Sequence, residues 1–379
     1  MRASPGGLTS RVARAGGRPS LLLDFVRSGA LTRAVVRGDA TISFTRDSPA
    51  THVIDGVVHH AAAGVPRFHP KKGLLIEGAA TTLTPRSRRL DDAGVWTPSD
   101  VSTAAVQGVD GVAGSATRIT ATGDGGTILG GTNTAGSAAR RLAPFIRRVA
   151  GTGELRWTLN GGGNYTAFSG ITSAWQRIEV GATVANPRVG FQIQASGDAF
   201  DVDFAGGETG SFATSPIESG AENALREVDM SMISAIGDSH WFQEIAGTWL
   251  VKIDTLPIAA DKDGSTNRFF LEVSDDAHAD RHQLLRTELQ FIASAVLQRI
   301  NGLTLAEERI GYAYATDNVA LYSEGVQMGA LLDMNPPLGL TTVFLGVRDD
   351  GHRALHTYLG GAAYWPRRLR NVDLKRFTQ

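Results

Sequence analysis

The sequence predicts an all-β protein, with two antiparallel β-sandwich modules of the jelly-roll type after an extended N-terminal region. Short runs rich in Val, Ile, Phe and Trp recur along the chain, and several alternate apolar with polar residues. Clusters of Gly, Asn, Pro and Asp separate these runs, and glycine makes up 45 of the 379 residues, well above the usual share of about 7%. Short strands at this spacing favour an antiparallel sandwich over a parallel sheet with crossover helices.

The chain length predicts two or three domains, because 379 residues exceed the usual size of one hydrophobic core. We expect an N-terminal arm and attachment region at 1–85, a jelly roll at 86–220 and a second sandwich at 221–379. The apolar run 21–23 is too short for a secretory signal, while an organellar transit peptide stays possible. The start of the chain is rich in Gly and Ala, and four arginines precede the first acidic residue, Asp24: Arg2, Arg11, Arg14 and Arg18. Two interpretations of this segment are equally open, a flexible arm that docks onto a neighbouring subunit and a disordered leader.

The strands of the two sandwiches are expected where the apolar runs lie between turn signals. In the first sandwich these runs are 156–159, 175–180, 189–194 and 199–204, with turn signals at 160–163, 186–187 and 196–198. In the second sandwich they are 229–233, 248–253, 268–273, 284–291, 293–299, 309–315, 319–323, 326–328 and 341–347. At 303–308 a helical turn competes with a loop, and we favour the loop.

The C-terminal segment predicts a final strand followed by a short helix. The strand is expected at 358–364, and it must stop near Pro366, which has no backbone N–H to donate to a neighbouring strand. The helix is expected at 371–377 with Asn371 as its N-cap. Its apolar face would consist of Val372, Leu374 and Phe377.

Three blocks of this sequence resemble phage and prophage tail-fibre and spike proteins. The end, a strand followed by YWPRRL at 364–369 and a short helix, resembles the close of a concanavalin A-like (laminin G-like) sandwich in such proteins. The order FTRxSxAT at 44–51, a DG turn, VPRF at 65–68 and GLLIE at 73–77 resembles a second pattern of these proteins. Residues 175–220 resemble the closing strands of a carbohydrate-binding-module-like jelly roll, and the resemblance is weakest at 267–298.

The resemblance implies a virion component, namely a fibre, spike or baseplate-associated protein. Its N-terminal region would attach to other virion proteins, and its sandwiches would bind host surface polysaccharide without covalent chemistry. Such proteins often form homotrimers, which multiply weak contacts by avidity. A purely architectural virion protein is a close alternative, and a polysaccharide depolymerase or a secreted lectin or adhesin stays open.

Composition excludes some classes of chemistry. The chain has no cysteine, so disulfides, thiolate nucleophiles and cysteine-bound metals are excluded. A formal net charge of −1 provides no overall field for nucleic acid, which makes nucleic acid a poor candidate partner. No apolar run approaches the roughly 20 residues that span a bilayer, so no membrane insertion is expected.

Candidate metal ligands are sparse in the sequence. His278 and His282 lie four residues apart, as do His352 and His356, but neither pair has the neighbouring glutamate of a zinc helix. We interpret all four as solvated loop histidines. Asp261, Asp263 and Gly264 are similar to the start of a calcium loop, and a polar turn is favoured there, as at Asp275 and Asp276, although calcium stays open near Asp261 and Asp263. No metal or cofactor is predicted.

Candidate carboxylate pairs for glycoside hydrolysis are equally weak. Asp201 and Asp203 would share one face of a strand, and Asp349 and Asp350 adjoin in a turn. We interpret both pairs as solvated turn or edge residues, while a pair at a subunit interface stays open. No nucleophile or phosphate-loop motif is present, so no catalytic residue and no enzyme is predicted.

Aromatic side chains near turns are the best candidates for a functional site, because sugar rings stack on them. Tyr165 with Asn164, and Trp241, are the predicted glycan-binding residues, and we expect Tyr165 and Trp241 to be exposed. The other strand tryptophans considered are expected to be core or seam residues: Trp157, Trp175, Trp249 and Trp365.

Overall fold

The computed structural model describes residues 17–31, 35–36, 42–237, 239–254, 267–275, 277–303 and 309–379. It confirms the all-β fold, since the described chain consists of antiparallel sheets with two short helices, α2 (Phe25–Ser28) and α3 (Asn371–Thr378). The predictions for the arginine-rich start up to Arg14, for 304–308 and for Asp261, Asp263, Gly264 and Asp276 fall outside the described residues. No helix in the described ranges is long and apolar enough to cross a membrane.

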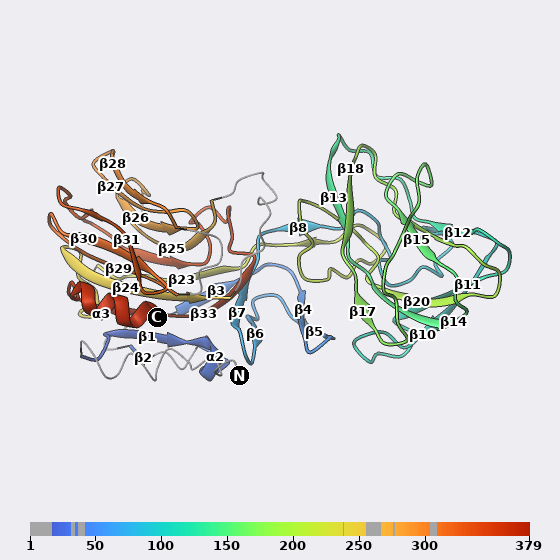
Figure 1. The fold of residues 1–379 in the computed structure, drawn as a ribbon, viewed down its shortest axis with the longest axis horizontal. Coiled ribbons are helices and arrows are strands. Elements are labelled where there is room, and N and C mark those ends of the chain that lie inside the picture. The colour runs from blue at the N-terminus through green and yellow to red at the C-terminus, as the bar shows by residue number, and fades with distance from the viewer. Residues whose placement is uncertain are drawn as a thin grey trace. The chain divides into compact units, whose positions relative to one another are not determined.

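The chain divides into two compact units (Figure 1). The C-terminal unit consists of the described residues within 1–47, 64–78 and 228–379, and the middle unit consists of 48–63 and 79–227. The division therefore does not follow the boundary expected near residue 85. Segments of the expected N-terminal region belong to both units, because they supply strands or hairpins to each.

The C-terminal unit is a sandwich of two antiparallel sheets within the described residues. A nine-stranded sheet has the order β2-β1-β33-β24-β29-β30-β31, with β7 also pairing with β33 and β6 with β7. Its strands are β1 (Leu21–Asp24), β2 (Val35–Val36), β6 (Arg67–His69), β7 (Gly73–Ile76), β24 (Ala246–Ile253), β29 (Arg309–Ala315), β30 (Val319–Ser323), β31 (Val326–Leu331) and β33 (Thr357–Trp365).

The second sheet of the C-terminal unit has seven strands in the described chain, in the order β28-β27-β26-β25-β32-β23-β3. They are β3 (Ile42–Thr45), β23 (Met230–Ile233), β25 (Phe269–Ser274), β26 (Arg281–Leu285), β27 (Glu288–Ala293), β28 (Val296–Asn301) and β32 (Thr342–Leu345). One buried cluster contains apolar residues of both sheets, such as Leu271 and Val273 from this sheet and Trp249 and Val251 from the other. The hydrophobic core of the unit therefore lies between the two sheets.

The middle unit contains two five-stranded sheets within the described residues, with orders β10-β11-β20-β14-β17 and β16-β15-β19-β12-β9. Ile119 and Val202 of the first sheet share one buried cluster with Phe191 and Leu155 of the second, so these sheets also form a sandwich. The strands are β9 (Thr97–Ser99), β10 (Val101–Val106), β11 (Ala116–Ala121), β12 (Gly126–Leu129), β14 (Phe145–Ala150), β15 (Leu155–Thr158), β16 (Thr166–Ala167), β17 (Gln176–Arg177), β19 (Gly190–Ile193) and β20 (Ala199–Asp203).

Smaller sheets complete the described part of the middle unit. They are the three-stranded sheet β18-β13-β21 and the pairs β22-β8 and β4-β5. Their strands are β4 (Ala50–Ile54), β5 (Val57–Ala61), β8 (Ala80–Thr81), β13 (Ala138–Leu142), β18 (Val180–Val184), β21 (Glu208–Thr209) and β22 (Leu225–Arg226).

Three strands predicted from the sequence are each divided in the structure. The run 293–299 covers the last residue of β27 and the start of β28. The apolar run 284–291 forms the end of β26 and the start of β27, because Leu284 pairs with Leu289 across a hairpin. The connection, Arg286 and Thr287, contains no glycine, asparagine or proline, so no turn signal marked it in the sequence. The run 175–180 likewise covers β17 and the first residue of β18.

The C-terminal helix α3 is confirmed, but its cap and its apolar face differ from the prediction. The N-cap is Arg370, which makes no side-chain capping hydrogen bond, and Asn371 is the first helical residue. Val372 is exposed, whereas Leu374 and Phe377 are buried as predicted. Phe377 stacks on Trp365 with ring centroids 5.3 Å apart, so α3 covers the face of the nine-stranded sheet that is turned away from the core (Figure 1).

A buried ionic cluster of Arg46, Arg67, Glu77 and Asp229 joins the N-terminal segments to the rest of the C-terminal unit. Arg46 Nη1 donates to Asp229 Oδ1 at 2.9 Å, and Arg67 Nη1 donates to Glu77 Oε2 at 2.7 Å. Arg67 also donates to Asp229 Oδ2, and the backbone N–H of Glu77 donates to the same oxygen at 2.9 Å. Two positive and two negative side chains thus balance one another inside the protein.

Burial by itself lowers the pKa of Arg67, but the charges of Asp229 and Glu77 outweigh this effect, so the pKa is raised. Three members of the cluster, Arg46, Arg67 and Glu77, come from the FTR, VPRF and GLLIE blocks of the sequence. These blocks therefore have a structural role, because each block supplies one charge to the same buried network.

We expect Asp229→Asn to destabilise the C-terminal unit by about 3–5 kcal/mol, because it leaves two buried arginines with one carboxylate. Chemical denaturation followed by tryptophan fluorescence measures the loss. Lys72→Ala is the matched control, since the Lys72–Asp254 pair is partly exposed to solvent and should contribute only about 0–1 kcal/mol. Equal stability of Asp229→Asn and the native chain would contradict a structural role for the cluster.

Candidate functional site

The candidate site is a polar hollow of about 330 Å³ on the C-terminal unit. It is lined by Phe269, His278, Arg281, Gln283, Leu285, Gln290, Arg348, Asp349 and Arg353. Seven of these nine residues carry hydrogen-bonding side chains, which is unusual for a cavity that buries a small apolar ligand. We refer to it as the polar hollow.

The polar hollow lies on the outer face of the seven-stranded sheet. Residues that pair directly across strands share a face, and the register aligns Glu272 with Gln283, then Gln290 and then Arg299. Their neighbours along each strand, such as Val273, point to the core instead. The strands thus present a row of polar side chains away from the core.

The loop between β32 and β33 lies over this row and forms one wall of the hollow. Its backbone is tied to β25, because the N–H of Phe269 donates to the carbonyl of Arg353 at 3.1 Å and that of Gly346 donates to Phe270 at 3.1 Å. The loop places Asp349 beside Glu272, whose side chain has no exposed surface. A residue on an outer sheet face is therefore buried by a loop from elsewhere in the chain.

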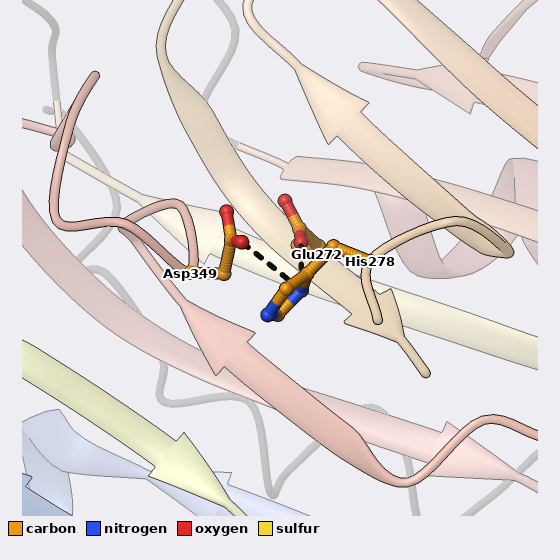
Figure 2. Close-up of side chains that lie close together, drawn as sticks. All are labelled: Glu272, His278 and Asp349. Carbon is orange, nitrogen blue, oxygen red and sulfur yellow. Dashed lines mark ion pairs between the residues drawn. The ribbon is translucent and has the colours of Figure 1, made fainter. Parts of the chain in front are cut away.

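Glu272, His278 and Asp349 form a compact group, which we call the carboxylate–histidine group (Figure 2). His278 and Asp349 line the hollow, and Glu272 lies buried next to them. His278 Nδ1 lies 3.0 Å from Asp349 Oδ2 and 3.7 Å from Glu272 Oε1. The Ser274 hydroxyl lies 3.1 Å from the same nitrogen. The His278 side chain is 37% exposed and that of Asp349 is 15% exposed, so the group is open on one side only.

Each carboxylate of the group is held through its other oxygen. Gln283 Nε2 donates to Glu272 Oε2 at 2.8 Å, and Arg348 Nε donates to Asp349 Oδ1 at 3.2 Å. Glu272 Oε1 is buried and has no hydrogen-bond partner among the described residues. Burial, followed by the charge of Asp349, raises the pKa of Glu272 to about 7, against the opposing effect of Gln283.

Three arginines give the rim of the hollow a positive character. Arg348 pairs with Asp349 and Asp350, whereas Arg281 donates to the backbone carbonyl of His278. Arg353 lines the hollow without an ion pair to any described residue. The side chains that face the opening are therefore suited to bind acidic or hydroxyl-rich molecules.

Histidines that are four residues apart in the sequence do not lie together in a common site in the structure. His278 belongs to the carboxylate–histidine group, but His282 is fully buried on β26, and His356 is also buried, so neither is a solvated loop residue. His282 Nδ1 shares a hydrogen bond of 2.6 Å with the Tyr312 hydroxyl of the opposite sheet. Burial lowers the pKa of His282 to about 3. His352 is exposed, as predicted.

The carboxylate pairs also differ from the prediction. Asp201 and Asp203 share one face of β20 as expected, but both are fully buried instead of solvated. Asp201 pairs with Arg118 and Arg147, and Asp203 pairs with Arg88, each through a contact of 2.8 Å. Burial raises the pKa of Asp203 although Arg88 opposes this effect. The pair therefore has a structural explanation within the middle unit.

The predicted glycan-binding aromatics have different environments. Trp241 is fully buried, so the expectation of exposure was wrong; its ring packs edge-to-face against Phe242, Trp249 and Tyr364 in the core. Asn164 is exposed and Tyr165 is half-buried on a loop that the Asn160 side chain closes by accepting from the N–H of Asn164 at 3.0 Å. Glycan binding by Tyr165 and Asn164 stays a prediction.

The remaining tryptophans follow the expected pattern in part. Trp249 and Trp365 are buried, as predicted for core residues. Trp157 and Trp175 are half-buried; Trp157 packs against the main core cluster of the middle unit and Trp175 against a smaller buried cluster. The guanidinium of Arg147 lies 4.7 Å from the Trp175 ring centroid.

No family model matches this chain, and no curated protein matches its sequence. The resemblance to phage tail-fibre and spike proteins accordingly stays a prediction. Sequence analysis named His278 and Asp349 separately but did not bring them together with Glu272, because the lining of the hollow comes from two distant stretches of the chain, 269–290 and 348–353. The one available signal was Glu272, a single acidic residue within the otherwise uncharged run FFLEVS.

We expect the C-terminal unit to become less stable as the pH is lowered below about 6.5, the ordinary pKa of histidine. The reason is that His282 takes up a proton in the unfolded chain but not in the folded chain. Since the folded pKa lies near 3, the loss continues down to about that pH. For this one residue, the free energy of unfolding falls by up to about 1.4 kcal/mol for each pH unit. Denaturant titrations at pH 4 to 7 measure it.

His282→Phe should reduce the pH dependence of the free energy of unfolding by about this slope. The variant also loses the hydrogen bond to Tyr312, but that loss of stability should be the same at every pH tested. The exposed control, His352→Gln, should keep the native slope. An unchanged slope in His282→Phe would show that other groups cause the acid sensitivity.

Proposed function

We propose that this chain is a structural component of a phage or phage-derived particle and that the polar hollow binds an acidic host-surface polysaccharide without covalent chemistry. The observation that carries the proposal is the lining of the hollow, where Arg281, Arg348 and Arg353 stand beside Gln283 and Gln290. Guanidinium groups bind sugar carboxylates or phosphates, and amides donate to and accept from hydroxyls. The assignment to a virion rests on the sequence resemblance.

A second candidate, polysaccharide depolymerase, draws on two neighbouring carboxylates: Asp349, which lines the hollow, and Glu272, which lies buried next to it. Glu272 has the raised pKa of a general acid, and its carboxylate oxygen and that of Asp349 lie within 4.8 Å of each other. The side chain of Glu272 has no exposed surface, however, and a general acid must reach the glycosidic oxygen within hydrogen-bond distance. This burial favours binding without hydrolysis.

The proposed role combines weak single sites with several copies of the chain. An open hollow with hydrogen bonds to a flexible sugar gains modest affinity, because ordering the ligand offsets much of the interaction energy. A homotrimer would bring three hollows to one polysaccharide chain and strengthen binding by avidity. The N-terminal region would hold the assembly on the particle. A purely architectural role would not require the lining of the hollow.

We expect the full chain to bind acidic polysaccharides from candidate host cells and to lose binding when the cell surface is stripped of them. The full chain is needed, because a fragment starting at residue 86 would lack β1, β3, β6 and β7 of the C-terminal unit. Arg353→Ala should weaken binding more than tenfold. Arg299→Ala, on the same sheet face but outside the lining, should not.

Polysaccharide length is followed in the same samples. Unchanged length with Arg353-dependent binding supports the proposal, whereas shortening of the polysaccharide would replace it with the depolymerase. Absence of binding to any acidic or neutral polysaccharide would favour the architectural role.

A further inference from the structure

We propose that Glu272, His278 and Asp349 bind one divalent transition-metal ion, of the Zn²⁺ or Mn²⁺ class, on the outer face of the seven-stranded sheet. The three side chains are brought together from β25, from the connection between β25 and β26, and from the loop between β32 and β33. Figure 2 shows that both carboxylates are turned toward the same edge of the imidazole ring. His278 and Asp349 also line the polar hollow, but metal binding by the three side chains does not require a polysaccharide.

The distances within the group match those between ligands of one metal ion. His278 Nδ1 is 3.0 Å from Asp349 Oδ2 and 3.7 Å from Glu272 Oε1. Ligands about 2.0–2.1 Å from a tetrahedral zinc ion lie about 3.3 Å from one another. The two observed distances lie on either side of that value, and all three ligand atoms lie within 4.8 Å of one another, so side-chain adjustment can bring them around one ion.

The carboxylates are oriented for this purpose by residues outside the group. Gln283 holds Glu272 Oε2 and Arg348 holds Asp349 Oδ1, which leaves Oε1 and Oδ2 turned toward His278. Outer groups that fix ligand orientation in this way are a regular feature of metal sites. The Ser274 hydroxyl lies 3.1 Å from Nδ1 and would give up this contact when the nitrogen binds the ion.

A second observation, separate from the clustering, points to a missing ligand. Glu272 Oε1 is fully buried and accepts no hydrogen bond from any described residue. A buried carboxylate oxygen without a hydrogen bond is destabilised, and the only ion-pair contact of Oε1 among the described residues, with His278 Nδ1, is long at 3.7 Å. A metal ion at this position would provide the partner.

The ligand set restricts the kind of metal. One imidazole nitrogen with two carboxylate oxygens suits Zn²⁺ or Mn²⁺, whereas Ca²⁺ and Mg²⁺ prefer oxygen ligands alone. Three protein ligands leave a coordination position open, and His278 and Asp349 are the partly exposed members of the group. The open position would therefore face the polar hollow and bind water or an oxygen atom of a ligand there.

The experiment is a calorimetric titration of the chelator-treated full chain with Zn²⁺, repeated with Asp349→Asn and Glu272→Gln. We expect one equivalent per chain at this site, and a loss of affinity of at least tenfold in each variant. Asp350→Asn is the matched control: it is the neighbouring carboxylate on the same loop and contacts the same arginine, but lies outside the group. It should bind zinc as the native chain does.

Circular dichroism of each variant establishes that it is folded. If one of the two variants does not fold, the other still tests the proposal. Zinc binding that both Asp349→Asn and Glu272→Gln retain would overturn the proposal, as would a native chain that binds no zinc. Because the titration contains no polysaccharide, its failure would leave the proposed glycan binding to be decided by the Arg353→Ala experiment.

Discussion

The buried ionic cluster of Arg46, Arg67, Glu77 and Asp229 is the constraint on which the arrangement of the C-terminal unit depends. Charged groups are stable inside a protein only when they are paired and hydrogen-bonded, so the four side chains must be in place together. They come from positions up to 183 residues apart in the chain. The cluster therefore fixes where β3, β6, β7 and β23 meet, and it joins segments that lie before, between and after the two stretches of the middle unit.

The polar hollow results from a similar combination of distant segments. The outer face of the seven-stranded sheet carries Glu272, Gln283 and Gln290 in one row, as the pairing of adjacent strands requires. Such a row is normally solvated. Here the loop after β32 covers part of it and adds Arg348 and Asp349, which creates a partly dehydrated polar site. Charge–charge interactions and hydrogen bonds within that site are therefore stronger than on an open surface.

His278 and His282 illustrate why sequence spacing did not identify the site. The strand β26 begins at Arg281, so the two residues lie in different structural contexts despite a spacing of four. His282 faces the core and bonds to Tyr312 across the sandwich, while His278 lies beside Asp349 on the outer side. The spacing of two residues in the sequence predicts that they share a face only when both belong to the same helix or strand.

The sequence by itself determined the all-β fold, the short antiparallel strands and the C-terminal helix, because alternation, turn residues and propensity act over a few neighbouring residues. It also placed Asp201 with Asp203 on one strand face and Trp249 in the core. Only the tertiary structure decided that Trp241 is buried, that Arg46 meets Asp229 and that Asp349 meets Glu272. These outcomes depend on which distant strands pair and which loops cover them, and no local pattern contains that information.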